Sequence, residues 1–344
     1  MKLCPIERIV FAHIDVIGIR EDVQIINANQ EQKRVDKQRK RAENVSMWQT
    51  NLIKLYCAVC EHYNTMEAMT QRQSNNFRPE FSDEECITVY LWGICQRRFG
   101  QRTIYEYTPN HLSDCFPRLS SYAAFSRWLN FLAPAFQTLA EEWLTVILEK
   151  EVENTTYIVD SCPVILAKWP RSGYEKVAGE LCAKSYNSSR MEWYYGVKLH
   201  TFVARKPGRL PAPMGLFLSG AAVHDLKAAK QILQDSRPLP PGILYADKAY
   251  LDSEWAKLLL EESAIQILTP RKKHKSDAIR SGDAFSTFVS SVRQPIECFF
   301  NWLNRLTNLQ TASMVRSLTC LLLHIFGRLA AALISLILTL DSHL

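Results

Sequence analysis

The chain has 344 residues, of which 47% are hydrophobic and 22% are charged, and its formal net charge is +6. This length allows one large domain or two modest ones, and the composition is typical of a globular protein, which excludes wholesale disorder. The mild excess of positive charge fits an anionic partner.

Residues 1–46 differ from the rest of the chain. The opening MKLCPIERIVFAHID carries Glu7, Arg8 and Asp15 within its apolar part, so it lacks the uninterrupted apolar stretch of a signal peptide. Six basic side chains follow between Lys33 and Arg41, a pattern typical of a solvated tail or of a nonspecific phosphate-binding segment. We predict a basic extension that lacks a fixed structure, and a cytoplasmic protein whose ten cysteines are mainly reduced.

Residues 47–150 are predicted to form a separate helical domain. NLIKLYCAVCEHY and FSDEECITVYLWGICQRRFG place apolar residues three and four positions apart, and Ser82 with Glu85 has the spacing of a capping box. Pro134 predicts a break or kink. The domain is either a DNA-binding module or a helical scaffold with an ordinary basic surface. Its arginines include Arg97, Arg98, Arg102, Arg118 and Arg127.

Cys57 and Cys60 form a CxxC pair within this helical domain. A structural zinc site needs a second pair of Cys or His ligands at a suitable spacing, and His62 alone does not supply it. We therefore predict that both cysteines are buried apolar residues on a helix.

From residue 155 the pattern changes to short apolar and β-branched runs alternating with amphipathic segments. This alternation predicts an α/β fold with a mixed sheet flanked by helices. The predicted strands are 155–166, 193–204, 213–223, 242–247 and 264–270, and the predicted helices are 224–234, 253–263 and 292–309.

The apolar segment 318–340 is long enough to be considered as a membrane span. His324 and Arg328 interrupt it, and the uncharged run 329–340 is short for a bilayer. A helix packed on the protein core is the favoured interpretation, and no membrane association is expected.

Three carboxylates from separate elements are candidates for a metal site. Asp160 and Asp247 each end a predicted strand, and Glu297 begins the last predicted helix on a largely apolar segment. Burial of a charge without a partner is costly, and clustered carboxylates repel each other unless a cation lies between them. Carboxylate oxygens suit Mg²⁺, and two such ions can promote phosphodiester chemistry. The alternative is that each Asp only caps a turn.

Several short motifs resemble the DDE transposases of bacterial insertion sequences, which have an RNase H-like catalytic core. YIVDSCPV and YADKAYLD resemble the segments of the two aspartates, RQPIECFFNWLNRL resembles the glutamate helix, and WYYGVKLH and SGAAVHDLKAA resemble the intervening segments. FSDEECITVYLWG and FPRLSSYAAFSRWL resemble the helical N-terminal half of one subgroup. The resemblance covers about residues 50–335 and is specific because the motifs occur together.

The resemblance implies that Asp160, Asp247 and Glu297 are the catalytic and metal-binding residues, with two Mg²⁺ ions that Mn²⁺ can replace. Arg293 matches the arginine of the glutamate signature. Some relatives carry a tyrosine and a lysine where this chain has Ser290 and Asn304, the latter followed by Arg305.

Other residues near the proposed site are candidates for supporting roles. His200 is expected to be a packed strand residue more often than a catalytic one, and His224 and Asp225 lie at a predicted helix start, which Asp225 could cap. Lys248 either contacts a phosphate or orients Asp247. The predicted DNA-contacting residues are Lys198, Lys248, Arg271, Lys272, Lys273, Arg293 and Arg305. A DNA channel is predicted between two basic loops, which contain Lys168, Arg171, Lys176, Lys184 and Arg190, and Arg271–Lys275.

These features predict three segments: a basic extension over 1–46, a helical DNA-binding domain over 47–150 and an RNase H-like catalytic domain over 151–340. The expected function is a Mg²⁺-dependent transposase that cleaves double-stranded DNA at terminal inverted repeats and joins the 3′-hydroxyl to target DNA. A homodimer associated with the nucleoid in the cytoplasm is expected. The alternative is a decayed or domesticated DNA-binding protein of the same fold.

Overall fold

The computed structural model describes residues 48–63, 80–150, 155–188, 190–235, 239–271 and 283–341. The basic extension over 1–46 and the basic residues Lys272, Lys273, His274 and Lys275 lie outside these described residues. Contacts divide the chain into two compact units, Met1–Leu139 with Ile334–Leu344, and Ala140–Leu333. The bounds of the units fall inside helices α6 (Ala133–Glu149) and α11 (Leu318–Asp341).

The described part of the first unit is helical. A helix covers residues 48–63 and is followed by α3 (Asp83–Cys95), α4 (Gln101–His111), α5 (Tyr122–Phe131) and the start of α6. The predicted capping box is confirmed, since Glu85 N–H donates to Ser82 Oγ and Ser82 N–H donates to Glu85 Oε2. Pro134 is the second residue of α6, so it marks the break after α5, as predicted.

The prediction of buried cysteines in the CxxC pair is wrong. Cys57 is exposed and Cys60 is half-buried. The buried face of helix 48–63 is carried by Leu52, Leu55 and Val59, whose spacing of three and four residues leaves Cys57 on another side.

Helix α11 is long and apolar enough to cross a membrane by length and composition, with a mean hydropathy of 2.2 over Leu318–Leu338. In this structure 67% of that window is buried. A core helix of a soluble protein passes the same test, so this single helix is weak evidence for a membrane span. His324, within the helix, donates a hydrogen bond from Nε2 to the Leu309 carbonyl at 2.9 Å, as expected for a helix packed on the protein core.

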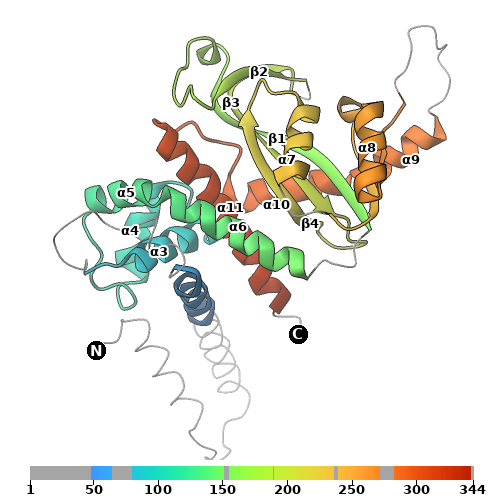
Figure 1. Ribbon diagram of the computed structural model, residues 1–344. Coiled ribbons are helices and arrows are strands. Elements are labelled where there is room, and N and C mark those ends of the chain that lie inside the picture. The colour runs from blue at the N-terminus through green and yellow to red at the C-terminus, as the bar shows by residue number, and fades with distance from the viewer. Residues whose placement is uncertain are drawn as a thin grey trace, which may run out of the picture. The chain divides into compact units, whose positions relative to one another are not determined.

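The second unit contains a mixed six-stranded sheet, drawn in green and yellow in Figure 1. The strands are β1 (Thr156–Lys168), β2 (Ala183–Asn187), β3 (Glu192–Ala204), β4 (Ala212–Gly220), β5 (Gly242–Tyr245) and β6 (Ile265–Leu268). They follow the order β2-β3-β1-β5-β6, and β4 also pairs with β3. β3 is antiparallel to β1, β2 and β4, whereas β5 is parallel to both β1 and β6.

Helices cover this sheet on both faces, which confirms the predicted mixed α/β fold. Helix α7 (Asp225–Asp235) lies in front of the strands in Figure 1, and α10 (Pro295–Thr307) passes behind them. Helix α8 (Ser253–Ser263) precedes the edge strand β6, and α9 (Ala284–Arg293) leads into α10. Ile296, Phe299 and Leu303 form the buried side of α10, as their spacing predicts.

Three details differ from the sequence-based prediction. β1 covers nearly the predicted range of 155–166, but Asp160 lies within the strand and not at its end, because the antiparallel pairing with β3 extends beyond the parallel pairing with β5. The predicted loop between the first two long strands contains β2, which alternates half-buried and exposed residues and lacks an apolar run. The predicted helix 292–309 is two helices, α9 and α10, because Pro295 begins the second of them.

Candidate active site

Asp160 and Asp247 lie at the same end of the parallel part of the sheet. The last parallel pair of β1 and β5 is Ile158 with Tyr245, and each aspartate follows its strand's member of that pair by two residues. Chemistry in open α/β sheets concentrates at the carboxyl ends of parallel strands. The register therefore brings together two of the three carboxylates that the sequence analysis selected.

Arg293, the last residue of α9, connects these two aspartates. Its Nη2 lies 3.0 Å from Asp160 Oδ2, and its Nη1 lies 3.7 Å from Asp247 Oδ1. The Arg293 side chain is 17% exposed, and its Nε is buried without a hydrogen-bond partner among the described residues. One guanidinium thus lies between two carboxylates, and it offsets one of their two negative charges.

The carboxyl group of Asp160 is difficult to ionise in this environment. Burial raises its pKa to about 6, although the positive charge of Arg293 and the hydrogen bond from Ser161 N–H act in the opposite direction. The negative charges of Asp225 and Asp247 raise the pKa further. An acidic group with a strongly perturbed pKa, surrounded by charged neighbours, is typical of a functional site.

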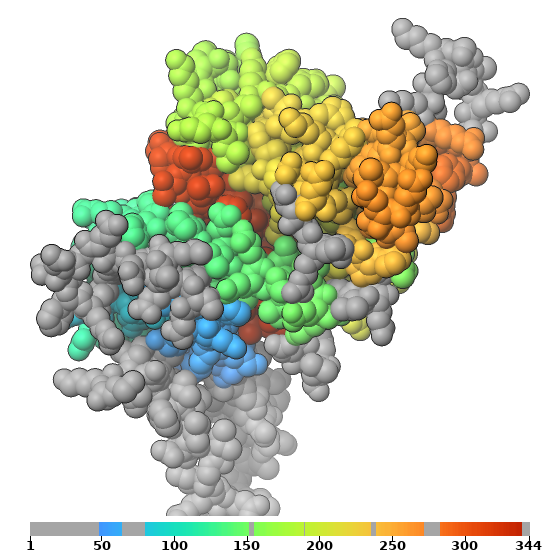
Figure 2. Space-filling model, in the orientation of Figure 1, coloured from blue at the N-terminus to red at the C-terminus, as the bar shows by residue number. Residues whose placement is uncertain are grey.

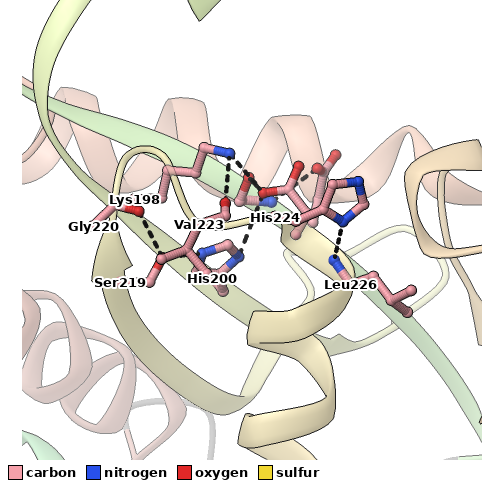
Figure 3. Close-up of polar contacts among 10 residues, drawn as sticks. Lys198, His200, Ser219, Gly220, Val223, His224 and Leu226 are labelled. Carbon is pink, nitrogen blue, oxygen red and sulfur yellow. Dashed lines mark hydrogen bonds and ion pairs between the residues drawn. The ribbon is translucent and has the colours of Figure 1, made fainter. Parts of the chain in front are cut away.

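Asp225 is a third aspartate beside this pair. Its Oδ1 accepts hydrogen bonds from Lys198 Nζ at 2.9 Å and from Ser161 Oγ at 3.2 Å. Figure 3 shows the Lys198 amine reaching the Val223 carbonyl and a neighbouring carboxylate, above His200 and Ser219. Lys198, predicted to contact DNA, is therefore paired with Asp225 in this structure, and the same carboxylate binds the side chain of Ser161, the residue after Asp160.

His200 is a buried residue of the strand, as the sequence analysis favoured. Its Nε2 lies 2.8 Å from Ser219 Oγ, and the same hydroxyl lies 3.2 Å from the Gly220 carbonyl oxygen. The other ring nitrogen, Nδ1, has no hydrogen-bond partner among the residues that the structure describes, and it lies 3.9 Å from Asp225 Oδ1. Burial lowers the pKa of His200 to about 4, so the ring is neutral near pH 7.

His224, rather than Asp225, caps helix α7. Its Nδ1 accepts from Leu226 N–H at 3.3 Å, as Figure 3 shows. Asp225 is the first residue of the helix, and its carboxylate is directed to Lys198 and Ser161 instead. The capping role that the sequence analysis left open for Asp225 therefore belongs to its neighbour.

The structure adds Tyr250 to the residues of the site. Its side chain is only 1% exposed, and its hydroxyl is buried without a hydrogen-bond partner among the described residues. Burial and the nearby charges of Asp160, Asp225 and Asp247 raise its pKa, so it is a neutral hydroxyl. The DKAY motif contains this tyrosine, three positions after Asp247, and that spacing is the signal by which it could have been found.

Tyr250→Phe is expected to leave the free energy of unfolding unchanged or to raise it by about 1 kcal/mol, because a buried hydroxyl without a partner costs desolvation energy. Urea unfolding measures this change. The matched control is Tyr63→Phe, in which the lost hydroxyl donates to Asp83 Oδ2 at 2.6 Å. This control should lose about 1–3 kcal/mol. An equal loss in both variants would mean that the Tyr250 hydroxyl is hydrogen-bonded in solution.

Glu297 lies in the first turn of α10 and is exposed. Its segment is buried as predicted, through Ile296 and Phe299, but its own carboxylate is not. The backbone remains helical through Gln294, so Arg293 and Glu297, four positions apart, face the same side. Among the described residues, no group of three or more His, Cys, Asp and Glu side chains is arranged to hold a metal ion.

The other predicted DNA contacts that the structure describes lie on the surface. Lys248 and Arg305 are exposed, and neither forms an ion pair with another described residue. Arg271 is exposed beside Asp283, with 3.7 Å between Nε and Oδ2. Its guanidinium also lies 5.7 Å from the centre of the Phe285 ring. Trp302 is half-buried, with its ring centre 5.8 Å from that of Phe299.

A family model agrees with the sequence motifs. Residues 150–316 match the family model described as "Transposase DDE domain". None of the curated proteins compared with the chain matches it. A solved structure of the piggyBac transposase synaptic complex with hairpin DNA is similar over 82% of this chain and 73% of that chain, with 9% identity and a TM-score of 0.41.

The family match covers all three predicted carboxylates and Arg293. The match supports the interpretation of this chain as a DDE transposase. Proteins of that class cut and join DNA.

Proposed function

We propose that this protein is a DNA transposase that cleaves the ends of an insertion sequence and joins the freed 3′-hydroxyl to target DNA. The observation that carries the proposal is the convergence of Asp160 and Asp247 on Arg293, within the segment that matches a transposase DDE domain. The sheet supports an RNase H-like core, since three antiparallel strands, β4, β3 and β1, continue into the parallel strands β5 and β6.

Asp160 and Asp247 fit a divalent cation, because their carboxylates already share a cationic group, the guanidinium of Arg293. Glu297 is the third proposed ligand, because it lies four positions after Arg293 and faces the same side. Two bound Mg²⁺ ions, or Mn²⁺ in their place, would activate the attacking hydroxyl and stabilise the leaving oxygen.

The remaining residues of the site have supporting roles in this proposal. The Lys198–Asp225 pair fixes Ser161 and through it the backbone that bears Asp160. Lys248, Arg271 and Arg305 are exposed cations that can contact phosphates of a DNA duplex. Transposition brings the two ends of the mobile DNA together, so we propose that the protein acts as a homodimer. We propose that it acts in the cytoplasm, at the nucleoid.

The direct test is strand cleavage of a labelled duplex that carries the inverted repeat flanking this reading frame. Wild type is expected to nick the duplex with Mg²⁺, and Asp160→Ala and Glu297→Ala are both expected to abolish nicking, since each removes a proposed ligand. Glu261→Ala, an exposed glutamate on α8, is the matched control and should nick as wild type does. Normal nicking by Glu297→Ala would remove Glu297 from the catalytic set.

A second candidate is a decayed or domesticated DNA-binding protein of the same fold. It is favoured by the exposed position of Glu297 and by the lack of a three-ligand group among the described residues. Binding of the inverted-repeat duplex without nicking by wild type would support this candidate. Nicking without joining of the ends to a target plasmid would instead indicate a nuclease.

A further inference from the structure

The hairpin of β2 and β3, together with the residue that follows β1, carries an exposed cluster of aromatic and cationic side chains. Its members are Trp169, Lys184, Tyr186 and Trp193, here called the β2–β3 aromatic surface. Trp169 is 66% exposed, and Tyr186 and Trp193 are each 47% exposed. The hairpin belongs to the yellow-green region of Figure 2. Exposed aromatic rings grouped on one surface indicate a binding site.

The strand register explains why these side chains meet. Tyr186 on β2 lies directly opposite Trp193 on β3, and Lys184 is two residues before Tyr186, so all three side chains point to one face. Trp169 follows the end of β1, and its N–H donates to the Trp193 carbonyl at 3.2 Å. β2 is an edge strand of the sheet, so no further described strand pairs beyond it.

A positive charge lies among the rings. Lys184 Nζ is 5.1 Å from the centre of the Trp193 ring and 5.8 Å from the centre of the Trp169 ring, and the rings of Tyr186 and Trp193 are 5.3 Å apart. The carboxylate of Glu192 is paired with Lys168 at 3.1 Å. Lys184 has no carboxylate partner among the described residues, so the surface is aromatic with a net positive charge.

The same sheet face carries Asp160. Trp193 and Thr201 are eight residues apart on β3, an even number, so their side chains point to the same side, and Thr201 lies opposite Asp160. Eight residues of strand span about 27 Å at about 3.4 Å each. A DNA strand bound at Asp160 therefore needs to extend about 27 Å along this face to reach the aromatic surface.

We propose that the β2–β3 aromatic surface binds unpaired bases of single-stranded DNA. Aromatic side chains stack on bases of any sequence, and cations beside them contact the backbone, which is the combination found in proteins that bind single strands. The proposal rests on the proposed function, because strand cleavage and joining expose single-stranded segments near the cut. A second copy of the chain could also pair with an edge strand, but the unpaired charge of Lys184 favours an anionic partner.

The test measures binding of a fluorescent oligothymidylate of about 20 nucleotides, longer than the site of one such surface. Fluorescence anisotropy is recorded in a chelator, so that no cleavage occurs, for wild type and for Trp169→Ala/Trp193→Ala. The double variant is expected to bind the single strand about 10-fold or more weakly, because stacking on each ring contributes substantially. Its affinity for a blunt duplex of the same length should change less than about 2-fold, since phosphate contacts dominate duplex binding.

Two controls accompany this comparison. Trp169→Phe/Trp193→Phe retains aromatic rings and should keep most of the affinity for the single strand, whereas Leu260→Ala removes an exposed apolar residue of α8 and should have no effect. Unchanged single-strand binding by the alanine variant would overturn the proposal, and so would an equal loss for single strand and duplex. Loss of self-association in ultracentrifugation, with single-strand binding unchanged, would assign the surface to a second copy of the chain. Nicking of the inverted-repeat duplex is measured separately, so failure of the proposed function is distinguishable from failure of this inference.

Discussion

Asp160→Asn is expected to abolish strand cleavage and yet to stabilise the metal-free protein at neutral and alkaline pH. The pKa of Asp160 is raised to about 6 in the folded protein, mainly by burial, from the value of 3.8 that an unperturbed Asp has. Between these two values the unfolded chain has lost the proton and the folded chain has kept it. Stability therefore falls as pH rises from about 4 to about 6, and it remains lower above that range.

The uncharged amide of Asn mimics the protonated carboxyl group, so this pH-dependent loss should be absent in the variant. A difference of about two pKa units corresponds to roughly 2–3 kcal/mol at about pH 8, and the two proteins should have equal stability near pH 4. Urea unfolding in a chelator across this pH range measures the effect. Asp114→Asn, at an exposed aspartate, is the control and should follow wild type.

The raised pKa of Asp160 would be contradicted if the difference in unfolding free energy between wild type and Asp160→Asn were the same at about pH 5 and at about pH 8. Added Mg²⁺ should narrow the difference between the two proteins at about pH 8, because a cation between the carboxylates favours the ionised form of Asp160. This second measurement does not depend on DNA cleavage, so it tests the site even if the conditions for cleavage are not met.

Much of the second unit could be predicted from the sequence because its long strands are continuous apolar runs. β1 and β3 are buried on both faces, and their composition alone predicts strands. The same argument fails for β2, which has only five residues and a half-exposed pattern, and it fails for the end of β1, because pairing partners decide where a strand ends. The exposed aromatic surface depends on β2 and therefore appears only in the structure.

The sequence allowed the residues of the site to be selected, but it did not show which of them contact each other. The carboxylates Asp160 and Asp247 could be selected because each follows a short apolar run. That Arg293 joins them could not be deduced, since 133 residues separate Arg293 from Asp160 in the chain. The exposure of Glu297 was equally hidden, because it depends on which side of α10 packs on the sheet and not on the apolar character of its neighbours.

Arg293→Gln is expected to lower the free energy of unfolding strongly, whereas Asp160→Asn is expected to raise it. Removal of the guanidinium leaves Asp160 and Asp247 beside each other without their shared counter-charge. Breaking a largely buried ion pair by deleting one partner typically costs about 3–5 kcal/mol, and the partial exposure of Asp247 reduces this to about 2–3 kcal/mol here. The loss should be greatest above pH 6, where both aspartates are ionised, and it is measured by urea unfolding in a chelator.

The same variant tests whether Arg293 occupies the position of a cation. If it does, Mg²⁺ should stabilise Arg293→Gln more than wild type, because the metal no longer competes with the guanidinium for the two carboxylates. Arg305→Gln, an exposed arginine of α10 without a described ion pair, is the control and should respond to Mg²⁺ as wild type does. In the double variant Asp160→Asn/Arg293→Gln, the stability loss should shrink, since one of the two uncompensated charges is gone. Equal stabilisation of wild type and Arg293→Gln by Mg²⁺ would mean that guanidinium and metal bind at different places, and the two aspartates would then not form a single cation site.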